Sequence, residues 1–467
     1  MKHRMITLLL ALLLAAALPL TALAEQPQGA PEGMPGEPPE GGMPGQPPQG
    51  GKPGQPPQGD MPGGGSSDFE YAAATEITEA AAEADGIYAS NTADESALIV
   101  NADADVTLTN PIVTKTGDSD GGDNCNFYGL NAAVLAMGGG TVTIEGGSVE
   151  SSAHGANGVF CYGGNGGHNG AEGDGTTVYI SDTSITTTGD GSGGIMTTGG
   201  GVTYASNLTV ETSGRSSAPI RTDRGGGTVY VDGGTYTSTG LGSPAIYSTA
   251  AISVSNATLV SNLSEGVCIE GMNSITLTDC DLTADNTQCN GNATFLDTIM
   301  IYQSMSGDAD SGNSTFTMTG GSLTSKSGHM FHVTNTNAII NLTGVALTNE
   351  DAENVLISVC NDGWNGASNS ATLNAAAQAL SGAILVGDNS SLSVKLTAGS
   401  SLEGCVNGAI TNSKGDVIST DVGTVVVSLD DTSTWTLTAD SYVTEFSGSM
   451  DNVNLNGYTL YVNGTAV

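Results

Sequence analysis

Basic side chains are scarce in this sequence: 10 Lys and Arg stand against 48 Asp and Glu, which gives a formal net charge of −38 at pH 7. A surface this acidic repels polyanions, so we expect neither nucleic acid nor an anionic membrane among the partners. Aromatic residues make up only 5% of the chain, and glycine is abundant, with 68 residues. This composition is typical of many short strands joined by tight turns.

Long apolar runs are also missing beyond the first residues. The single such run, Ile6 to Leu20, follows the basic Lys2–Arg4 and ends in Ala22-Leu23-Ala24. This order is typical of a secretory signal peptide over residues 1–24, cleaved before Glu25, and a retained membrane anchor is the alternative. We therefore predict a secreted or cell-surface protein. The seven cysteines show no paired spacing, so buried free thiols are expected and no zinc site is predicted.

Residues 25–67 contain a proline-rich nonapeptide repeated as Met34–Gly42, Met43–Gly51 and Lys52–Asp60. Proline at this density prevents both helix formation and strand pairing, and glycine keeps the chain from being stiff. The segment is predicted to be a disordered spacer that holds a folded domain away from a cell surface. A solubilising tail without a further role is the alternative.

The rest of the chain lacks helical periodicity and repeats a short apolar–polar–apolar arm instead. Nine copies begin 23 to 41 residues apart, at Val106, Val142, Val178, Thr203, Val229, Ile252, Ile275, Phe316 and Ile340. Periods of this length predict a solenoid, in which stacked units share one core. Four residues after each start, only residues that tolerate a left-handed backbone occur: Asn110, Gly146, Asp182, Asn207, Gly233, Asn256, Asp279, Gly320 and Gly344. Each unit is thus predicted to be one coil with a tight turn between two strands.

Three arms per coil with an Asn/Gly/Asp bend resemble the right-handed parallel β-helix superfamily of pectate-lyase-like enzymes and bacterial surface adhesins. The resemblance covers residues 95–467 and implies an all-β, right-handed β-helix of about fourteen coils. Residues 68–94 are expected to cap its N-terminal end, and residues 391–467 to form looser C-terminal coils. None of the catalytic tripeptides of polygalacturonases occurs in the sequence.

Polar side chains gather on the outward positions of the third arm of each coil, whose aligned inward residues are predicted to include Ile220, Ile246, Val267, Ile301, Phe331 and Leu356. Alternation along a strand places these residues on one face beside the long insertions, which usually wall a binding surface. With Ile220 facing the core, its neighbour Arg221 is expected to be exposed there. The predicted binding residues of this face are Tyr162, Arg221, Asp223, Arg224, Tyr247, Glu270, Tyr302 and His332.

The cluster Arg221-Thr222-Asp223-Arg224 allows two interpretations. The arginines either neutralise Asp223 in a structural role or recognise a sugar carboxylate through bidentate hydrogen bonds. Resemblance to polysaccharide lyases implies that an arginine could act as the base that removes a proton beside a uronate. Two insertions also carry closely spaced carboxylates, a pattern suited to Ca²⁺, and the predicted ligands are Asp118, Asp120, Asp123, Asp308, Asp310 and Asn313.

A second candidate surface lies on the first arm, where Tyr179, Tyr204 and Tyr230 take the outward position of three successive coils. Such a strip can stack on sugar rings, or it can simply stabilise neighbouring coils. We therefore expect a monomeric, secreted, adhesin-like protein that binds a polysaccharide on its outer strand face. The alternatives are a polysaccharide lyase or glycosidase acting on an acidic glycan, and a purely structural surface spacer.

Overall fold

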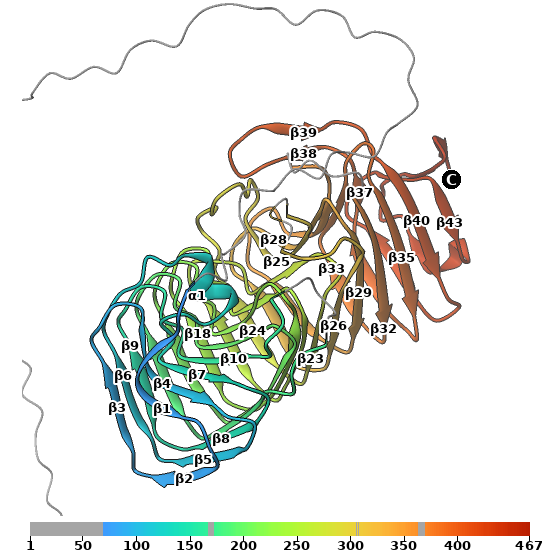
Figure 1. Ribbon diagram of the computed structural model, residues 1–467. Coiled ribbons are helices and arrows are strands. Elements are labelled where there is room, and N and C mark those ends of the chain that lie inside the picture. Colours follow the sequence, from blue (N-terminus) through green and yellow to red (C-terminus); the bar gives the residue numbers. More distant parts are fainter. Residues whose placement is uncertain (1–68, 167–171, 305, 307, 363–368) are drawn as a thin grey trace, which may run out of the picture. The chain divides into compact units, whose positions relative to one another are not determined.

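The computed structural model describes residues 69–166, 172–304, 306, 308–362 and 369–467. Their strands form three long parallel sheets, and each coil up to β30 adds one strand to each sheet (Figure 1). The expected all-β parallel β-helix with three strands per coil is confirmed. The predicted signal peptide (1–24) and spacer (25–67) lie outside the described residues.

Sheet A contains 13 strands. In spatial order they are β1 (Ala72–Ile77), β4 (Glu95–Asn101), β7 (Val134–Met137), β10 (Val159–Tyr162), β13 (Ile195–Thr198), β16 (Ile220–Thr222), β19 (Ile246–Ser248), β22 (Val267–Glu270), β25 (Asp297–Tyr302), β28 (His329–Thr334), β31 (Val355–Val359), β34 (Ala383–Val386) and β37 (Val406–Asn407).

Sheet B contains 14 strands. They are β2 (Ala81–Ala84), β5 (Asp105–Thr109), β8 (Thr141–Glu145), β11 (Thr177–Ser181), β14 (Gly201–Ser206), β17 (Gly227–Asp232), β20 (Ala251–Ser255), β23 (Ser274–Thr278), β26 (Asn313–Thr319), β29 (Asn337–Thr343), β32 (Ser370–Ala376), β35 (Ser391–Thr397), β40 (Thr424–Leu429) and β43 (Glu445–Ser447).

Sheet C contains 10 strands. They are β3 (Ile87–Ser90), β6 (Ile112–Lys115), β9 (Ser148–Ser151), β12 (Ser184–Thr187), β15 (Thr209–Thr212), β18 (Thr235–Ser238), β21 (Thr258–Ser261), β24 (Asp281–Ala284), β27 (Ser322–Ser325) and β30 (Ala346–Asn349).

Beyond β30, the third side of the coils is built by sheet D, made of β33 (Ala379–Ser381), β36 (Ser401–Gly404), β41 (Thr434–Leu437) and β44 (Val453–Asn454). The chain closes with a small sheet of β42 (Ser441–Val443), β45 (Leu460–Val462) and β46 (Thr465–Ala466), in which the last pair is antiparallel. Between β37 and β40, β38 (Ile410–Thr411) and β39 (Val417–Ser419) form an antiparallel pair. The helical elements of the described residues are α1 (Asp123–Phe127) and the 3₁₀ turn η1 (Met450–Asn452). Neither is long and apolar enough to cross a membrane.

The core lies inside the coils, where the strands place alternate side chains. In β17, Val229 and Val231 are buried while Tyr230 between them is exposed. Larger inward residues such as Phe316 and Phe331 are also fully buried. Each coil is too small to bury these groups alone, so stacking of neighbouring coils makes the core.

The turn between sheets B and C follows the sequence pattern. Asn110, Asp182 and Asn207 have φ values of 50°, 51° and 51°, and the glycines at the same position are also left-handed. The predicted left-handed turn is therefore confirmed. Two later coils place Ala377 (φ 50°) and Ala398 (φ 55°) in this conformation, which is unfavourable for a residue with a Cβ.

The N-terminal coil is formed by β1, β2 and β3, which pair with the second coil. The described part of the stretch expected to be a cap is thus itself a coil. Tyr88 of β3 is buried, and its hydroxyl donates to the Glu83 carboxylate in β2. At the position of Leu108 in the next coil, this coil carries the charged Glu83 instead. This polar pair therefore lies at the N-terminal end of the apolar core in the described part of the chain.

Candidate functional site

Two outer surfaces hold the predicted residues: the outer face of sheet A and the outer face of sheet B. On sheet A, Arg221 lies beside Tyr247, and Tyr247 lies beside Cys268, in neighbouring strands. The expected column is therefore present. It is not an open surface, however, because loops on both sides of the sheet fold over it.

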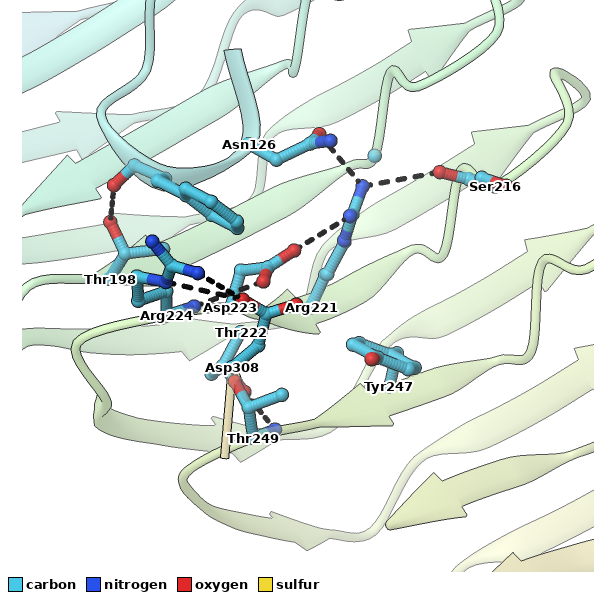
Figure 2. Close-up of polar contacts among 12 residues, drawn as sticks. Asn126, Thr198, Ser216, Arg221, Thr222, Asp223, Arg224, Tyr247, Thr249 and Asp308 are labelled. Carbon is cyan, nitrogen blue, oxygen red and sulfur yellow. Dashed lines mark hydrogen bonds and ion pairs between the residues drawn. The ribbon is translucent and has the colours of Figure 1, made fainter. Parts of the chain in front are cut away.

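Arg221 is covered, contrary to the expectation that it is exposed. Only 9% of its surface is accessible, and its Nη1 donates to Asn126 Oδ1 at 3.1 Å and to the Ser216 carbonyl at 3.2 Å (Figure 2). Asn126 belongs to α1, which lies in the insertion between β6 and β7. Strand alternation correctly predicted that Arg221 points away from the core. It could not predict that a loop from another coil covers the side chain. The guanidinium is thus enclosed between the sheet and this insertion.

Asp223 supplies the counter-charge. Its Oδ2 lies 2.8 Å from Arg221 Nη2, and its side chain is only 8% exposed. Burial raises the pKa of Asp223 to about 6, although the charge of Arg221 opposes this shift. A buried pair of this kind satisfies its own charges. The geometry of the cluster therefore agrees with the structural interpretation, in which an arginine neutralises Asp223.

Arg224 connects the covering loops to the sheet. Its Nε and Nη2 lie 3.1 and 2.7 Å from Asp308 Oδ1 (Figure 2). Its guanidinium lies 4.4 Å from the centre of the Phe127 ring. Phe127 ends α1, whereas Asp308 lies between β25 and β26. Arg224 thus links two insertions that are far apart in the sequence.

Glu270 is the centre of a second polar group. Its Oε2 accepts hydrogen bonds from the hydroxyls of Tyr247 at 2.5 Å and Tyr302 at 3.1 Å. Ser304 and Ser306 donate to the other oxygen, Oε1. Burial is the main cause that raises the pKa of both phenols, and the nearby Glu270 charge adds to it. Both phenols therefore remain protonated donors.

The predicted register of the third arm was wrong at β31, where Ile357 rather than Leu356 aligns with Phe331, and at β25. Ile299, not Ile301, aligns with Val267, so Tyr302 pairs with Glu270 rather than with Cys268. A shift of two residues keeps the side chain on the same face, which is why Tyr302 still reaches the predicted surface. The long insertion before β25 hides this shift in the sequence.

His332 belongs to a separate buried cluster, four strands from Arg221 and thus about 19 Å away at the usual strand spacing. Its Nδ1 lies 2.8 Å from Ser358 Oγ, which also lies 2.7 Å from His329 Nδ1. On its other side, Nε2 lies 3.4 Å from Asp362 Oδ2. His332 is fully buried and stacks on Phe295 at 4.3 Å, so it faces a covering loop rather than solvent.

Tyr162 lies two strands from Arg221 in sheet A and packs edge-on against Tyr128 at 5.8 Å. Asp118 accepts a hydrogen bond from the His154 amide, and Asp308 pairs with Arg224. Burial and the neighbouring Asp308 raise the pKa of Asp123. Within the described ranges, no three His, Cys, Asp or Glu side chains are arranged to hold a metal ion. Calcium binding by Asp118, Asp120, Asp123, Asp308, Asp310 and Asn313 stays a prediction.

The tyrosines on sheet B form an open ladder. Tyr179, Tyr204 and Tyr230 occupy aligned positions in β11, β14 and β17 and are 45%, 39% and 43% exposed. Their ring centres are 4.9 and 5.0 Å apart, and neighbouring planes differ by only 8° and 12°. The predicted alignment is therefore correct, and these aromatic groups are accessible to a ligand.

The ladder lies in a groove of about 680 Å³ on the outer face of sheet B. Hydroxyl groups of the neighbouring strands line it beside the rings, supplied by Thr143, Ser181, Ser206, Ser253, Ser255, Thr276 and Thr278. Two carboxylates, Glu145 and Asp232, complete the polar lining. The sequence reasoning missed both, although each stands two residues beyond the outward position of its strand and hence on the same face.

Comparison with known proteins finds no family model, no curated protein and no solved structure that matches this chain.

Proposed function

We propose that the protein is a secreted or cell-surface, adhesin-like protein that binds an extended glycan along the outer face of sheet B. The proposal rests chiefly on the exposed ladder of Tyr179, Tyr204 and Tyr230 in a groove rich in hydroxyl groups. Residues 1–24, with their signal-peptide pattern, support export of the protein. Similarity to the adhesins of the parallel β-helix superfamily belongs to this proposal, because the fold alone does not determine function.

The ring geometry suits a sugar ligand. Carbon atoms in contact lie about 3.5–4.0 Å apart, so parallel rings whose centres are 4.9 Å apart must be offset. Each ring therefore overlaps its neighbour only in part and leaves some of its face uncovered. Small residues, Thr143 and Ser253, stand at the same position in the coils on either side of the ladder. The outer faces of Tyr179 and Tyr230 thus have no ring stacked against them and can receive a sugar ring.

The hydroxyl lining complements these apolar faces. Serine and threonine hydroxyls both donate and accept hydrogen bonds, as sugar hydroxyls do. Because the coils repeat at about 4.8 Å, these groups recur at regular intervals along the groove. A regular polymer can then make the same contacts several times, and weak contacts add up along its length.

The enzyme alternative would use the covered face of sheet A. There, Arg221 and Arg224 are engaged with Asp223 and Asp308, and Glu270 accepts several hydroxyl donors. This geometry offers a glycan no free guanidinium at the predicted position of Arg221. The open groove of sheet B supports binding better than it supports cleavage.

The test is binding of the full chain to a panel of neutral, amino-containing and uronate-containing polysaccharides. The matched variant is Tyr204→Thr, because Thr107, Thr143 and Thr276 already occupy this position in other coils. We expect it to weaken glycan binding about tenfold or more while the melting temperature changes little. Tyr442→Ala is the control, since Tyr442 is also exposed and stacks on Tyr461 at 4.9 Å outside the groove.

If Tyr204→Thr retains full affinity, the groove is not the glycan-binding site. Release of unsaturated products from a uronate polymer, seen as new absorbance, would favour the lyase alternative. If the protein binds none of the glycans, the structural surface spacer would remain as its function.

A further inference from the structure

The groove on sheet B carries negative charge at two places along its length. Its sixteen lining residues, all of them described, include Glu145 and Asp232 but no lysine, arginine or histidine. Glu145 lies in β8, one strand before the tyrosine ladder, and Asp232 lies in β17, the strand of the last tyrosine. The two strands are three coils apart, or about 14 Å at the coil spacing. The two carboxylates therefore lie along the aromatic surface, one a strand before its first ring and one in the strand of its last ring.

Asp232 is held in place by its neighbours. Its Oδ1 accepts hydrogen bonds from Ser255 Oγ at 2.8 Å and from Asn256 Nδ2 at 2.7 Å. The hydrogen bonds from Asn256 and Ser255 lower the pKa of Asp232, so its side chain is a carboxylate at neutral pH and well below it. Its side chain is nevertheless exposed, and Tyr230, two residues earlier in β17, points to the same side. A sugar stacked on the outer face of Tyr230 would thus have an oriented carboxylate beside it.

The faces of the tyrosine rings, like the two carboxylates, favour a positively charged ligand. The face of an aromatic ring carries partial negative charge and attracts a cation placed over it. A uronate or sulfated sugar would meet two carboxylates, three ring faces and a protein with a net charge of −38. A neutral sugar would be accepted by the rings and hydroxyls but would leave the carboxylates without a partner.

On this basis we infer that the glycan is one that carries free, protonated amino groups, such as a polymer of β-linked glucosamine units. This inference rests on the proposed function, because it concerns the ligand of the same groove. Each ammonium group can donate to Asp232 or Glu145 while its ring stacks on a tyrosine. Charge-assisted hydrogen bonds of this kind are about twice as strong as neutral ones.

The experiment compares soluble glucosamine oligomers with their fully N-acetylated counterparts on the full chain, at physiological salt, by calorimetry. Acetylation removes the charge and keeps the ring. We expect the free-amine oligomer to bind at least about tenfold more tightly than the acetylated one. The double variant E145Q/D232N should reduce this preference to less than about threefold, with the acetylated oligomer bound as before.

A polycation also binds an acidic protein without specificity, so the charge change needs a matched control. Glu150 in β9 and Glu211 in β15 are exposed at aligned positions on sheet C, outside the groove. The variant E150Q/E211Q changes the net charge by the same amount and should keep the full preference. Non-specific attraction between exposed charges is largely screened at this salt concentration, which separates the two effects further.

Three results would overturn the inference. The first is equal affinity for the amine and acetylated oligomers, with binding of both lost in Tyr204→Thr. This result would support the groove as a glycan site but would show that it has no preference for amines. An equal loss of preference in both double variants would assign the preference to general charge. Binding of either oligomer that Tyr204→Thr leaves unchanged would reject the proposed function itself, and this inference with it.

Discussion

Arg221 Nη2 and Asp223 Oδ2 lie 2.8 Å apart, and both side chains are covered by loops although both point away from the core. The two residues are neighbours on one face of sheet A, and α1 closes over them through Asn126. The β-helix thus has a second buried layer between sheet A and its insertions, which is apolar at Leu135, Phe160 and Met196 and polar around Arg221. In this layer, charged residues that the strand pattern assigns to the surface contribute to stability.

Arg221→Ala should therefore destabilise the fold. Removing one partner of a buried ion pair leaves the other charge unpaired and usually costs about 3–5 kcal/mol. Ile220→Ala, which truncates a core side chain, should cost about 2–5 kcal/mol, so two adjacent residues should give similar losses. Urea unfolding measures both changes. Arg215→Ala is the control, because Arg215 is exposed and bonds to Asn290 on the surface. An Arg221→Ala variant as stable as the Arg215→Ala variant would contradict the buried layer.

Asp223 should make stability fall as the pH rises through about 6. The carboxyl of Asp223 has a pKa of about 6 in the folded protein against an ordinary value of 3.8, so the folded state binds the proton more tightly. The stabilisation from this group is complete below about pH 4 and is lost as the pH passes the folded pKa. A pKa difference of about 2 corresponds to about 3 kcal/mol. Relative to Asp223→Asn, the wild type should thus lose up to about 3 kcal/mol of unfolding free energy between pH 4 and 7.

A pH series extended below pH 4 on Asp232→Asn provides the sign control. Hydrogen bonds from Asn256 and Ser255 lower the pKa of Asp232, so its stabilisation is present at neutral pH and is lost on acidification. The two variants should therefore diverge from the wild type in opposite directions. A wild type and Asp223→Asn that keep a constant difference in stability across this range would show that Asp223 does not titrate there.

The sequence predicted the coils because their periodicity is local. Strand alternation and the turn residue recur in each coil, so Tyr204 could be placed on an outer face and Asn207 in a left-handed turn. The covering of Arg221 could not be predicted, because Asn126 approaches it from 95 residues away through an irregular insertion. Likewise, the acidic pattern of the loop with Asp308 suited calcium equally well, and only the fold brings Arg224 beside it. What the pattern determines is the direction of a side chain, whereas insertions determine its exposure.

Ala377→Asn should stabilise the protein. Ala377 has a φ of 50° at the turn where other coils carry Asn, Asp or Gly, and it is exposed, so a longer side chain has room. A left-handed conformation costs a residue with a Cβ about 1–2 kcal/mol, and asparagine recovers part of it through local hydrogen bonding. We expect a gain of about 0.5–1 kcal/mol in chemical unfolding. Ala379→Asn, at an exposed strand position in β33, should give no gain. Equal effects at both positions would indicate that the turn conformation is not the cause.

Arg224→Ala should loosen the cover of sheet A more than it destabilises the coils. Arg224 bonds to Asp308 through two nitrogens and lies over the Phe127 ring, and it thereby holds two insertions against the sheet. Its side chain and that of Asp308 are 17% and 19% exposed, so water can replace part of the lost contact. Hydrogen exchange should accelerate in α1 and in residues 308–312, while the strands of sheet B keep their protection.

Asp308→Asn provides the matched variant, because it removes the charge of the same contact and keeps a hydrogen-bond acceptor. It should accelerate exchange in the same two segments by a smaller factor. Uniform acceleration across all sheets would show that Arg224 supports the whole fold. Unchanged exchange in α1 and residues 308–312 would show that the insertions are held by other contacts, such as the hydrogen bond of 2.7 Å from the Thr198 hydroxyl to the Phe127 carbonyl. Glycan binding at the tyrosine ladder should be unaffected in both variants, since the ladder lies on sheet B and the cover lies on sheet A.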